Sequence, residues 1–301
     1  MSAVTRRAFL THGLAASVAA LAAPRVAAIP PIERPGKPLF RLSLSAYSLR
    51  DHFSGRLQPA MTLDDYVDFA GRLELDAVEP TAYYFKDTSP AGLARLKARC
   101  TRLGLDISGG AVGNNFCHPD PAGLQAEIKS VKQWIERYAL LGAKTVRIFA
   151  GTVAKGDSEE KARARCVAAI HECCDYAARY GVFLALENHG GITSTPDQLL
   201  ALVQAVKHDC FAVNLDTGNF RTEDPYGDLA RVATYAVTVQ VKTEIQRANR
   251  PKEEADLGRI IAILRQANYR GYLALEYEAA DPPLTAIPRY VATLRRLIAT
   301  A

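Results

Sequence analysis

Four short apolar segments of this chain each end in one side chain that carries an oxygen donor. The four side chains, in chain order, are Glu187, Asp216, Gln240 and Glu276. Burying unpaired carboxylates costs several kcal/mol each, so a cluster of them needs a cation. Carboxylate and amide oxygens are the ligands that hard divalent ions prefer, and the set has no thiolate or imidazole. The sequence therefore predicts a site for one divalent metal ion, with Mn²⁺ or Mg²⁺ favoured over Zn²⁺.

Side-chain alternation in these segments separates an apolar face from a polar one. Over residues 239–242, two valines point one way while Gln240 and Lys242 point the other. Two further predicted strands repeat the pattern, with Glu79 and Arg147 as their polar members. A lone inward glutamate is more often an ion-pair partner, so a salt bridge between Glu79 and Arg147 is an equally good interpretation. Lys242 can likewise serve only to neutralise neighbouring acids.

Eight β-rich segments alternate with amphipathic helical segments from residue 39 onward. The predicted strands cover residues 40–47, 77–83, 105–111, 145–150, 183–189, 211–219, 236–243 and 272–278. Eight strand–helix units in alternation indicate a parallel sheet, and eight is the number that closes a (β/α)8 barrel. A doubly wound open sheet is the main alternative, but the glycine-rich turn it usually has after the first strand is missing. We therefore predict an α/β protein with a single (β/α)8 TIM barrel domain and polar residues at its carboxyl face.

The first 28 residues have the pattern of an export signal. Arg6 and Arg7 form a twin-arginine pair, a mildly apolar run follows, and the small residues at 26–28 suit cleavage. The apolar run is too short and too rich in alanine for a confident membrane span. We predict a signal peptide over residues 1–28, the barrel over residues 29–301, and a periplasmic location. No stable membrane span is expected after cleavage, although retention of the signal as an anchor stays open.

Removal of this signal also removes three arginines and no acids, which lowers the formal net charge from +5 to +2. A nearly neutral chain gives no electrostatic reason to expect nucleic-acid binding. The six cysteines show no C-x-x-C pair, so we expect free, mostly buried thiols. The composition leaves the formation of a homo-oligomer open.

Several segments together resemble a known protein family. These segments are residues 184–191 (LALENHGG), 214–220 (NLDTGNF), 239–243 (VQVKT), 273–278 (LALEYE), 114–120 (NNFCHPD) and 145–151 (TVRIFAG). They are similar to the sugar phosphate isomerase/epimerase family, within the xylose isomerase-like TIM barrels. Each fragment alone is weakly specific, but their order and spacing together are strong and cover nearly all of the chain after the signal.

The resemblance implies a metal site with one unusual member. Characterised relatives hold the metal with Glu, Asp, His and Glu from the fifth to eighth strands, which correspond here to Glu187, Asp216, Gln240 and Glu276. Gln240 departs from the pattern because it stands where relatives have histidine, although its amide oxygen can still bind a metal. The resemblance also implies that Glu187 and Glu276 double as acid and base.

The remaining candidate residues are polar side chains near predicted strand ends. The resemblance implies that Lys242, His189 and Asn219 contact the substrate, and Lys242 would also stabilise the charge that develops during reaction. We predict that the other substrate-binding residues are Tyr47, Glu79, His118 and Arg147. The expected partner is a small-molecule sugar.

The expected chemistry is proton transfer at a carbon next to a carbonyl group. A divalent cation would polarise the carbonyl and favour an enediolate, while Glu187 removes a proton and Glu276 returns one. Return to the opposite face gives epimerisation, and return to the neighbouring carbon gives aldose–ketose isomerisation. Expulsion of a leaving group from a 3-keto-glycoside would make the protein a lyase. A non-catalytic carbohydrate-binding barrel is less favoured because both glutamates are present.

Two other features of the sequence narrow the substrate. The DNA-repair endonucleases of this superfamily bind several metals through many histidines. Few histidines lie near the predicted barrel mouth here, so we do not expect an endonuclease. Export of the protein from the cytoplasm predicts a substrate without phosphate, since sugar phosphates are made and kept in the cytoplasm. Glu244 and the prolines within 279–283 also leave the last two loops without a phosphate cradle. We therefore expect a free sugar, a keto-sugar or a keto-glycoside.

Overall fold

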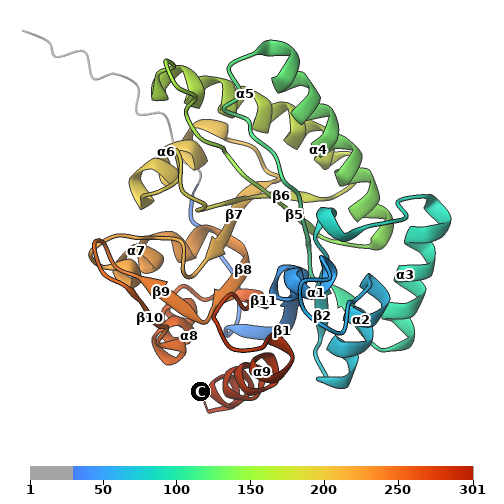
Figure 1. The fold of residues 1–301 in the computed structure, drawn as a ribbon. Coiled ribbons are helices and arrows are strands. Elements are labelled where there is room, and N and C mark those ends of the chain that lie inside the picture. The colour runs from blue at the N-terminus through green and yellow to red at the C-terminus, as the bar shows by residue number, and fades with distance from the viewer. Residues whose placement is uncertain (1–29, 301) are drawn as a thin grey trace, which may run out of the picture.

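The computed structural model describes residues 30–300, and a parallel sheet that curls into a barrel forms their centre (Figure 1). Neighbouring strands follow the order β3-β2-β1-β11-β8-β7-β6-β5-β4. Their bounds are β1 (Leu39–Ser45), β2 (Ala77–Glu79), β3 (Asp106–Ile107), β4 (Gly110–Ala111), β5 (Thr145–Ile148), β6 (Phe183–Glu187), β7 (Phe211–Asp216), β8 (Ala236–Lys242) and β11 (Arg270–Glu276). The predicted signal peptide lies outside the described residues, so the boundary at residue 28 stays a prediction.

The two edge strands of this sheet, β3 and β4, are consecutive pieces of one interrupted strand. Only Ser108 and Gly109 separate them, and Ala111 forms a parallel bridge with Thr81 just beyond β2. A Cβ at Gly109 would lie 2.5 Å from the hydroxyl oxygen of Thr145, so glycine lets the chain pass close to β5 here. Counting β3 and β4 as one strand leaves eight strand units, which confirms the predicted (β/α)8 TIM barrel.

Helices follow the strands and pack around the outside of the barrel (Figure 1). Their bounds are α1 (Arg50–Phe53), α2 (Leu63–Arg72), α3 (Pro90–Arg102), α4 (Pro121–Leu141), α5 (Glu159–Ala178), α6 (Pro196–Val206), α7 (Pro225–Val232), α8 (Leu257–Gln266) and α9 (Pro283–Ala299). Leu184 and Leu186 of β6 belong to one buried core with Ile170 of α5 and Leu199 of α6. This close packing fixes the strands and therefore the polar residues at their ends.

Local sequence signals set the ends of several helices. Thr62 and Asp65 form a capping box at the start of α2, in which the Thr62 N–H donates to Asp65 Oδ2 at 2.8 Å. Thr195 and Gln198 form the same arrangement at α6. Gly142 ends α4 with φ at +93°, a conformation that glycine adopts readily. Helix starts and stops of this kind are therefore readable from the sequence.

The structure differs from the sequence prediction mainly in the loops beyond the strands. The predicted strands continue to His189 and Asn219, whereas β6 ends at Glu187 and β7 ends at Asp216. After β8 the chain also forms an unpredicted antiparallel hairpin of β9 (Glu244–Gln246) and β10 (Lys252–Glu254). The β-strand propensity of a residue does not depend on where the neighbouring strand ends. A prediction from sequence therefore extends strands too far.

The six cysteines of the chain are all free, as expected. Five of them are buried, and Cys210 is partly exposed. Within residues 30–300, no helix is both long enough and apolar enough to cross a lipid bilayer.

Candidate functional site

Strand register brings the predicted ligands to one end of the barrel. Asp216 of β7 pairs with Gln240 of β8, and Lys242 of β8 pairs with Glu276 of β11. Glu187 is the last residue of β6, and all five of these residues are buried. They occupy the carboxyl ends of parallel strands, the face at which barrel enzymes carry their active sites.

Lys242 is the centre of a group of three carboxylates. Its ammonium forms ion pairs with Glu276 and Glu278, and it lies 3.3 Å from Asp216 Oδ2. Burial disfavours the charged lysine, but the three carboxylates outweigh burial and raise its pKa well above the usual range. The same ammonium opposes the effect of burial on Glu276, whose pKa is lowered. Lys242 is therefore a cation and Glu276 a carboxylate at neutral pH.

Glu187 lies in a different environment, on the far side of β7 and β8 from Glu276. Its Oε2 is 2.9 Å from Arg147 Nε, and its Oε1 accepts a hydrogen bond of 2.9 Å from Asn219 Nδ2. Burial raises the pKa of Glu187 to about 8, because Arg147 offsets only part of the effect and the charges of Asp216 and Glu276 add to it. Glu187 therefore takes up a proton at a higher pH than an ordinary glutamate does, while Arg147 stabilises its charged form.

Gln240 is bonded at both ends of its amide. Its Nε2 donates to Glu79 Oε1 at 2.7 Å, and its Oε1 accepts from Asn214 Nδ2 at 2.8 Å. Burial raises the pKa of Glu79 to about 7, although the hydrogen bond from Gln240 opposes the rise. The salt bridge suggested between Glu79 and Arg147 is therefore replaced by two other pairs, Glu79 with Gln240 and Arg147 with Glu187.

The buried cluster contains more acidic than basic side chains. Its two cations, Arg147 and Lys242, face four buried acidic side chains and one half-buried one, which are Glu79, Glu187, Asp216 and Glu276, and Glu278. Burial raises the pKa of Asp216 to about 7, and Lys242 opposes that rise. A further positive charge would therefore stabilise the ionised form of the cluster.

A divalent ion fits this donor set in ligand type and charge. Asp216 Oδ2 is buried without a hydrogen-bond partner, and the adjacent Lys242 ammonium marks a position that favours positive charge. The oxygens of Gln240 and Glu187 are instead bonded to protein groups. Within residues 30–300, no three or more His, Cys, Asp or Glu side chains are arranged around a common metal position. The four-ligand site stays a prediction, and two of its members, Asp216 and Glu276, contact one cation.

The predicted substrate-binding residues separate into two groups. Asn219 contacts Glu187 directly, and the ring of His189 packs on Phe149 with centroids 4.1 Å apart at the same end of the barrel. Tyr47 is half-buried, and the charge of Glu278 contributes to a raised pKa after the larger effect of burial. These three residues lie beside the buried cluster, whereas Glu79 and Arg147 are members of it.

His118 lies apart from this group. Its ring nitrogen accepts a hydrogen bond from the Asp120 N–H at 3.2 Å, at the start of α4. The ring also packs against the first turn of that helix, beside Gly123. The structure shows no contact between His118 and the carboxylates, so its observed role is local.

Comparison with known proteins agrees with this architecture. The family model for the xylose isomerase-like TIM barrel matches residues 67–297. The chain belongs to the xylose isomerase-like TIM barrel family. No curated protein matches the sequence.

Solved structures similar to this xylose isomerase-like barrel share the fold at low sequence identity. L-ribulose 3-epimerase superposes with a TM-score of 0.72 at 16% identity, over 87% of this chain and 95% of that one. D-psicose 3-epimerase from Clostridium cellulolyticum H10 gives 0.68 at 15%, over 86% and 99%. A 3-keto-D-glucoside 4-epimerase from E. coli gives 0.68 at 15%, over 86% and 100%. At these identities the likeness concerns the fold.

Several residues of this barrel site escaped the sequence prediction. Glu278 pairs with Lys242 and lies two residues beyond Glu276, so the two-residue period of a strand could have identified it. Asn214 precedes Asp216 by the same spacing. Ser45, at the end of β1, donates to Glu276 Oε2 at 2.8 Å. Serine is common in strands and loops, and nothing in the sequence distinguishes this one.

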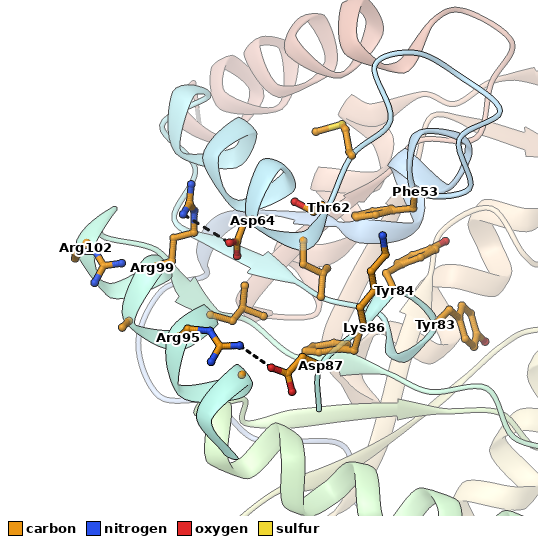
Figure 2. Close-up of a pocket in the computed structure, with 16 residues that line it drawn as sticks. Phe53, Thr62, Asp64, Tyr83, Tyr84, Lys86, Asp87, Arg95, Arg99 and Arg102 are labelled. Atoms are coloured by element: carbon orange, nitrogen blue, oxygen red, sulfur yellow. Dashed lines mark hydrogen bonds and ion pairs between the residues drawn. The ribbon is translucent and has the colours of Figure 1, made fainter. Parts of the chain in front are cut away.

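Cavities open at the mouth of the xylose isomerase-like barrel and beside it. One of about 220 Å³ is lined by Phe149 and His189, and a smaller one of about 40 Å³ by Lys242 and Glu278. A larger cavity of about 550 Å³ lies between α2 and α3, next to the aromatic pair Phe53–Tyr84, and Figure 2 shows Asp64 and Asp87 among its lining residues. None of the four predicted metal ligands lines it. The candidate site is therefore chosen by its buried charges rather than by cavity size.

Proposed function

We propose that the protein is an isomerase or epimerase that acts on a non-phosphorylated sugar or keto-sugar by moving a proton next to a carbonyl group. The observation that carries this proposal is the pair Glu187 and Glu276, two buried carboxylates on separate strands of one site with different partners. Glu187 is paired with Arg147, whereas Glu276 is paired with Lys242 and Ser45. Two carboxylates in unlike environments are the usual basis of an acid–base pair.

The partners of the two glutamates suggest their starting roles. Lys242 lowers the pKa of Glu276, which makes this carboxylate a weak base. The pKa of Glu187 is raised, so this residue exchanges a proton closer to neutral pH. The order expected from the sequence, in which Glu187 removes the proton and Glu276 returns one, therefore stays part of the proposal. An epimerase must run in both directions, so each residue takes the other role in the reverse reaction.

Lys242 is the group best placed to stabilise charge that develops on the sugar. Its ammonium has three donors and lines the cavity at the barrel mouth. A divalent ion, when bound, would polarise the carbonyl and the adjacent hydroxyl, and Mn²⁺ or Mg²⁺ suits the oxygen donors. Asp216 and Glu276 would hold it, joined by Glu187 and Gln240 if those two exchange their present partners.

The arrangement of Arg147 supports a substrate without phosphate. Its guanidinium is already engaged by Glu187, by the Val112 carbonyl oxygen at 2.8 Å and by the Phe149 ring. Lys252 at the mouth is paired with Glu244 at 3.4 Å. The predicted twin-arginine signal adds a periplasmic location to the proposal, which cell fractionation would test.

Deuterium exchange at carbon is the decisive test of this function. The protein is incubated with Mn²⁺ in deuterated water together with ketoses, 3-keto-glucosides and matched sugar phosphates, and NMR locates any new C–D bond. We expect exchange next to the carbonyl of an unphosphorylated sugar. Release of a free leaving group would identify a lyase instead. Absence of exchange with every sugar would contradict the enzymatic proposal, and preference for a phosphate would contradict the substrate class.

A further inference from the structure

The Lys242 ammonium contacts carboxylate oxygens that a bound metal ion would also need. Its ammonium is 3.3 Å from Asp216 Oδ2 and forms an ion pair with Glu276. The other two predicted metal ligands are engaged elsewhere, because Gln240 Oε1 accepts a hydrogen bond from Asn214 and Glu187 is paired with Arg147. A divalent ion and an ammonium cannot both touch these oxygens without strong repulsion between the two cations.

The third partner of Lys242 lies farther toward the mouth of the barrel. Glu278 follows the end of β11 by two residues, and its side chain is 31% exposed, compared with 8% for Glu276. It lines the mouth cavity together with Lys242. The lysine stem is unbranched and flexible, so its ammonium can leave the inner carboxylates and stay paired with Glu278.

We propose that Lys242 is an exchangeable internal cation. In the absence of metal its ammonium neutralises Asp216 and Glu276, and when a divalent ion binds it moves outward and pairs with Glu278 alone. Metal affinity is then set partly by the cost of displacing the lysine, and metal binding delivers an ammonium to the mouth where substrate enters. This inference rests on the metal-dependent form of the proposed function.

The Mn²⁺ affinity of variants that each lack one lysine charge tests whether Lys242 competes with the metal. Mn²⁺ binding is measured by isothermal titration calorimetry on the wild type, Lys242→Met and Lys252→Met, with circular dichroism as a check on folding. Lys252 is the matched control, because it lines the same cavity but pairs with Glu244. We expect Lys242→Met to bind Mn²⁺ at least about tenfold more tightly, a change of about 1.4 kcal/mol, and Lys252→Met to match the wild type. Equal or weaker binding by Lys242→Met would overturn the proposal.

A double-mutant cycle tests the role of Glu278. Glu278→Gln should weaken Mn²⁺ binding in the wild type, because the displaced ammonium loses its outer partner. In the Lys242→Met background the same change should have an effect at least about threefold smaller. An equal effect in both backgrounds would mean that Glu278 acts on the metal directly, and would contradict its role as a positioning residue for the lysine.

The wild-type protein provides a test that does not depend on the folding of any variant. Reductive methylation of lysines, with and without Mn²⁺, is followed by mass spectrometry of the peptides. We expect Mn²⁺ to increase modification of Lys242, which is 8% exposed, and to leave that of Lys252 unchanged. Unchanged modification of Lys242 at saturating Mn²⁺ would overturn the proposal. None of these measurements uses a sugar, so failure here is distinguishable from failure of the proposed reaction.

Discussion

Arg147 of β5 and Glu187 of β6 form a buried ion pair across adjacent strands, with Arg147 Nε 2.9 Å from Glu187 Oε2. The strand register sets Arg147 beside Ala185, so the long arginine side chain extends toward the end of β6 to meet the glutamate. The guanidinium also lies 3.9 Å from the centroid of the Phe149 ring. The charge of Arg147 is therefore fixed where it can limit the pKa of Glu187.

Replacing Arg147 with methionine should destabilise the fold in a pH-dependent way. Loss of one partner of a buried ion pair costs about 3–5 kcal/mol when the other stays charged. Glu187 can take up a proton instead, since its pKa is about 8, so the loss should be larger at pH 9 than at pH 6. Urea unfolding at both pH values measures the difference. Arg259→Met, at an exposed residue, is the control, and an equal loss at both pH values for Arg147→Met would contradict the assignment.

Glu187→Gln and Glu276→Gln should each reduce carbon–hydrogen exchange on the sugar by about 10²–10⁴-fold, the usual contribution of general acid–base catalysis. Both changes keep the side-chain volume but remove the proton-transfer group. Glu244→Gln, at a partly exposed glutamate paired with Lys252, should exchange at the wild-type rate. If either variant binds Mn²⁺ normally and keeps its exchange rate, that residue has no role in proton transfer.

The positions of the site residues along the chain were readable from the sequence, because alternation on a strand is a local property. Asp216, Gln240, Lys242 and Glu276 were found in this way, and register brings them to one end of the barrel. The sequence does not show with which side chain each charged residue forms an ion pair. Glu79 and Glu187 both lie on predicted strands near Arg147, and the choice between them depends on the stagger of the strands in the closed barrel.

Residues beyond strand ends show a second limit of the sequence. Glu278 continues the two-residue spacing of β11 past its last paired residue, where alternation no longer guarantees a direction. His118 falls within a fragment that resembles the family, yet it is held locally by Asp120. Loop geometry depends on contacts between distant segments, so neither position could be decided from spacing alone.

Gln240→His should shift the metal preference toward softer ions. Imidazole nitrogen favours Zn²⁺ more than an amide oxygen does, and histidine is the residue that the family resemblance implies at this position. The change also breaks the bonds from Gln240 to Glu79 and Asn214, so a loss of about 1–3 kcal/mol in stability is expected without metal. Elemental analysis and competitive titration of Mn²⁺ and Zn²⁺ measure the shift. Stoichiometric zinc in the wild-type protein would contradict the predicted preference for Mn²⁺ or Mg²⁺.

The metal-free protein should become less stable as the pH rises from about 5 to about 9. The pKa values of Glu79 and Asp216 are about 7 and that of Glu187 is about 8, all above their usual values. The folded state therefore binds more protons than the unfolded state in this window, so the free energy of unfolding falls with pH. Glu276 has a lowered pKa and titrates below the window.

The melting temperature measured across this range should fall by about 5 °C or more, which corresponds to roughly 2 kcal/mol for a domain of this size. Glu79→Gln removes one of the three titrations and keeps the side-chain volume, so its melting temperature should depend less on pH than that of the wild type. Glu244→Gln should leave the profile unchanged, because Glu244 lies outside the buried cluster. Mn²⁺ binds the ionised carboxylates, so it should raise the melting temperature most at the alkaline end. A melting temperature that rises with pH in the metal-free protein would show that the cluster is already neutralised by other means.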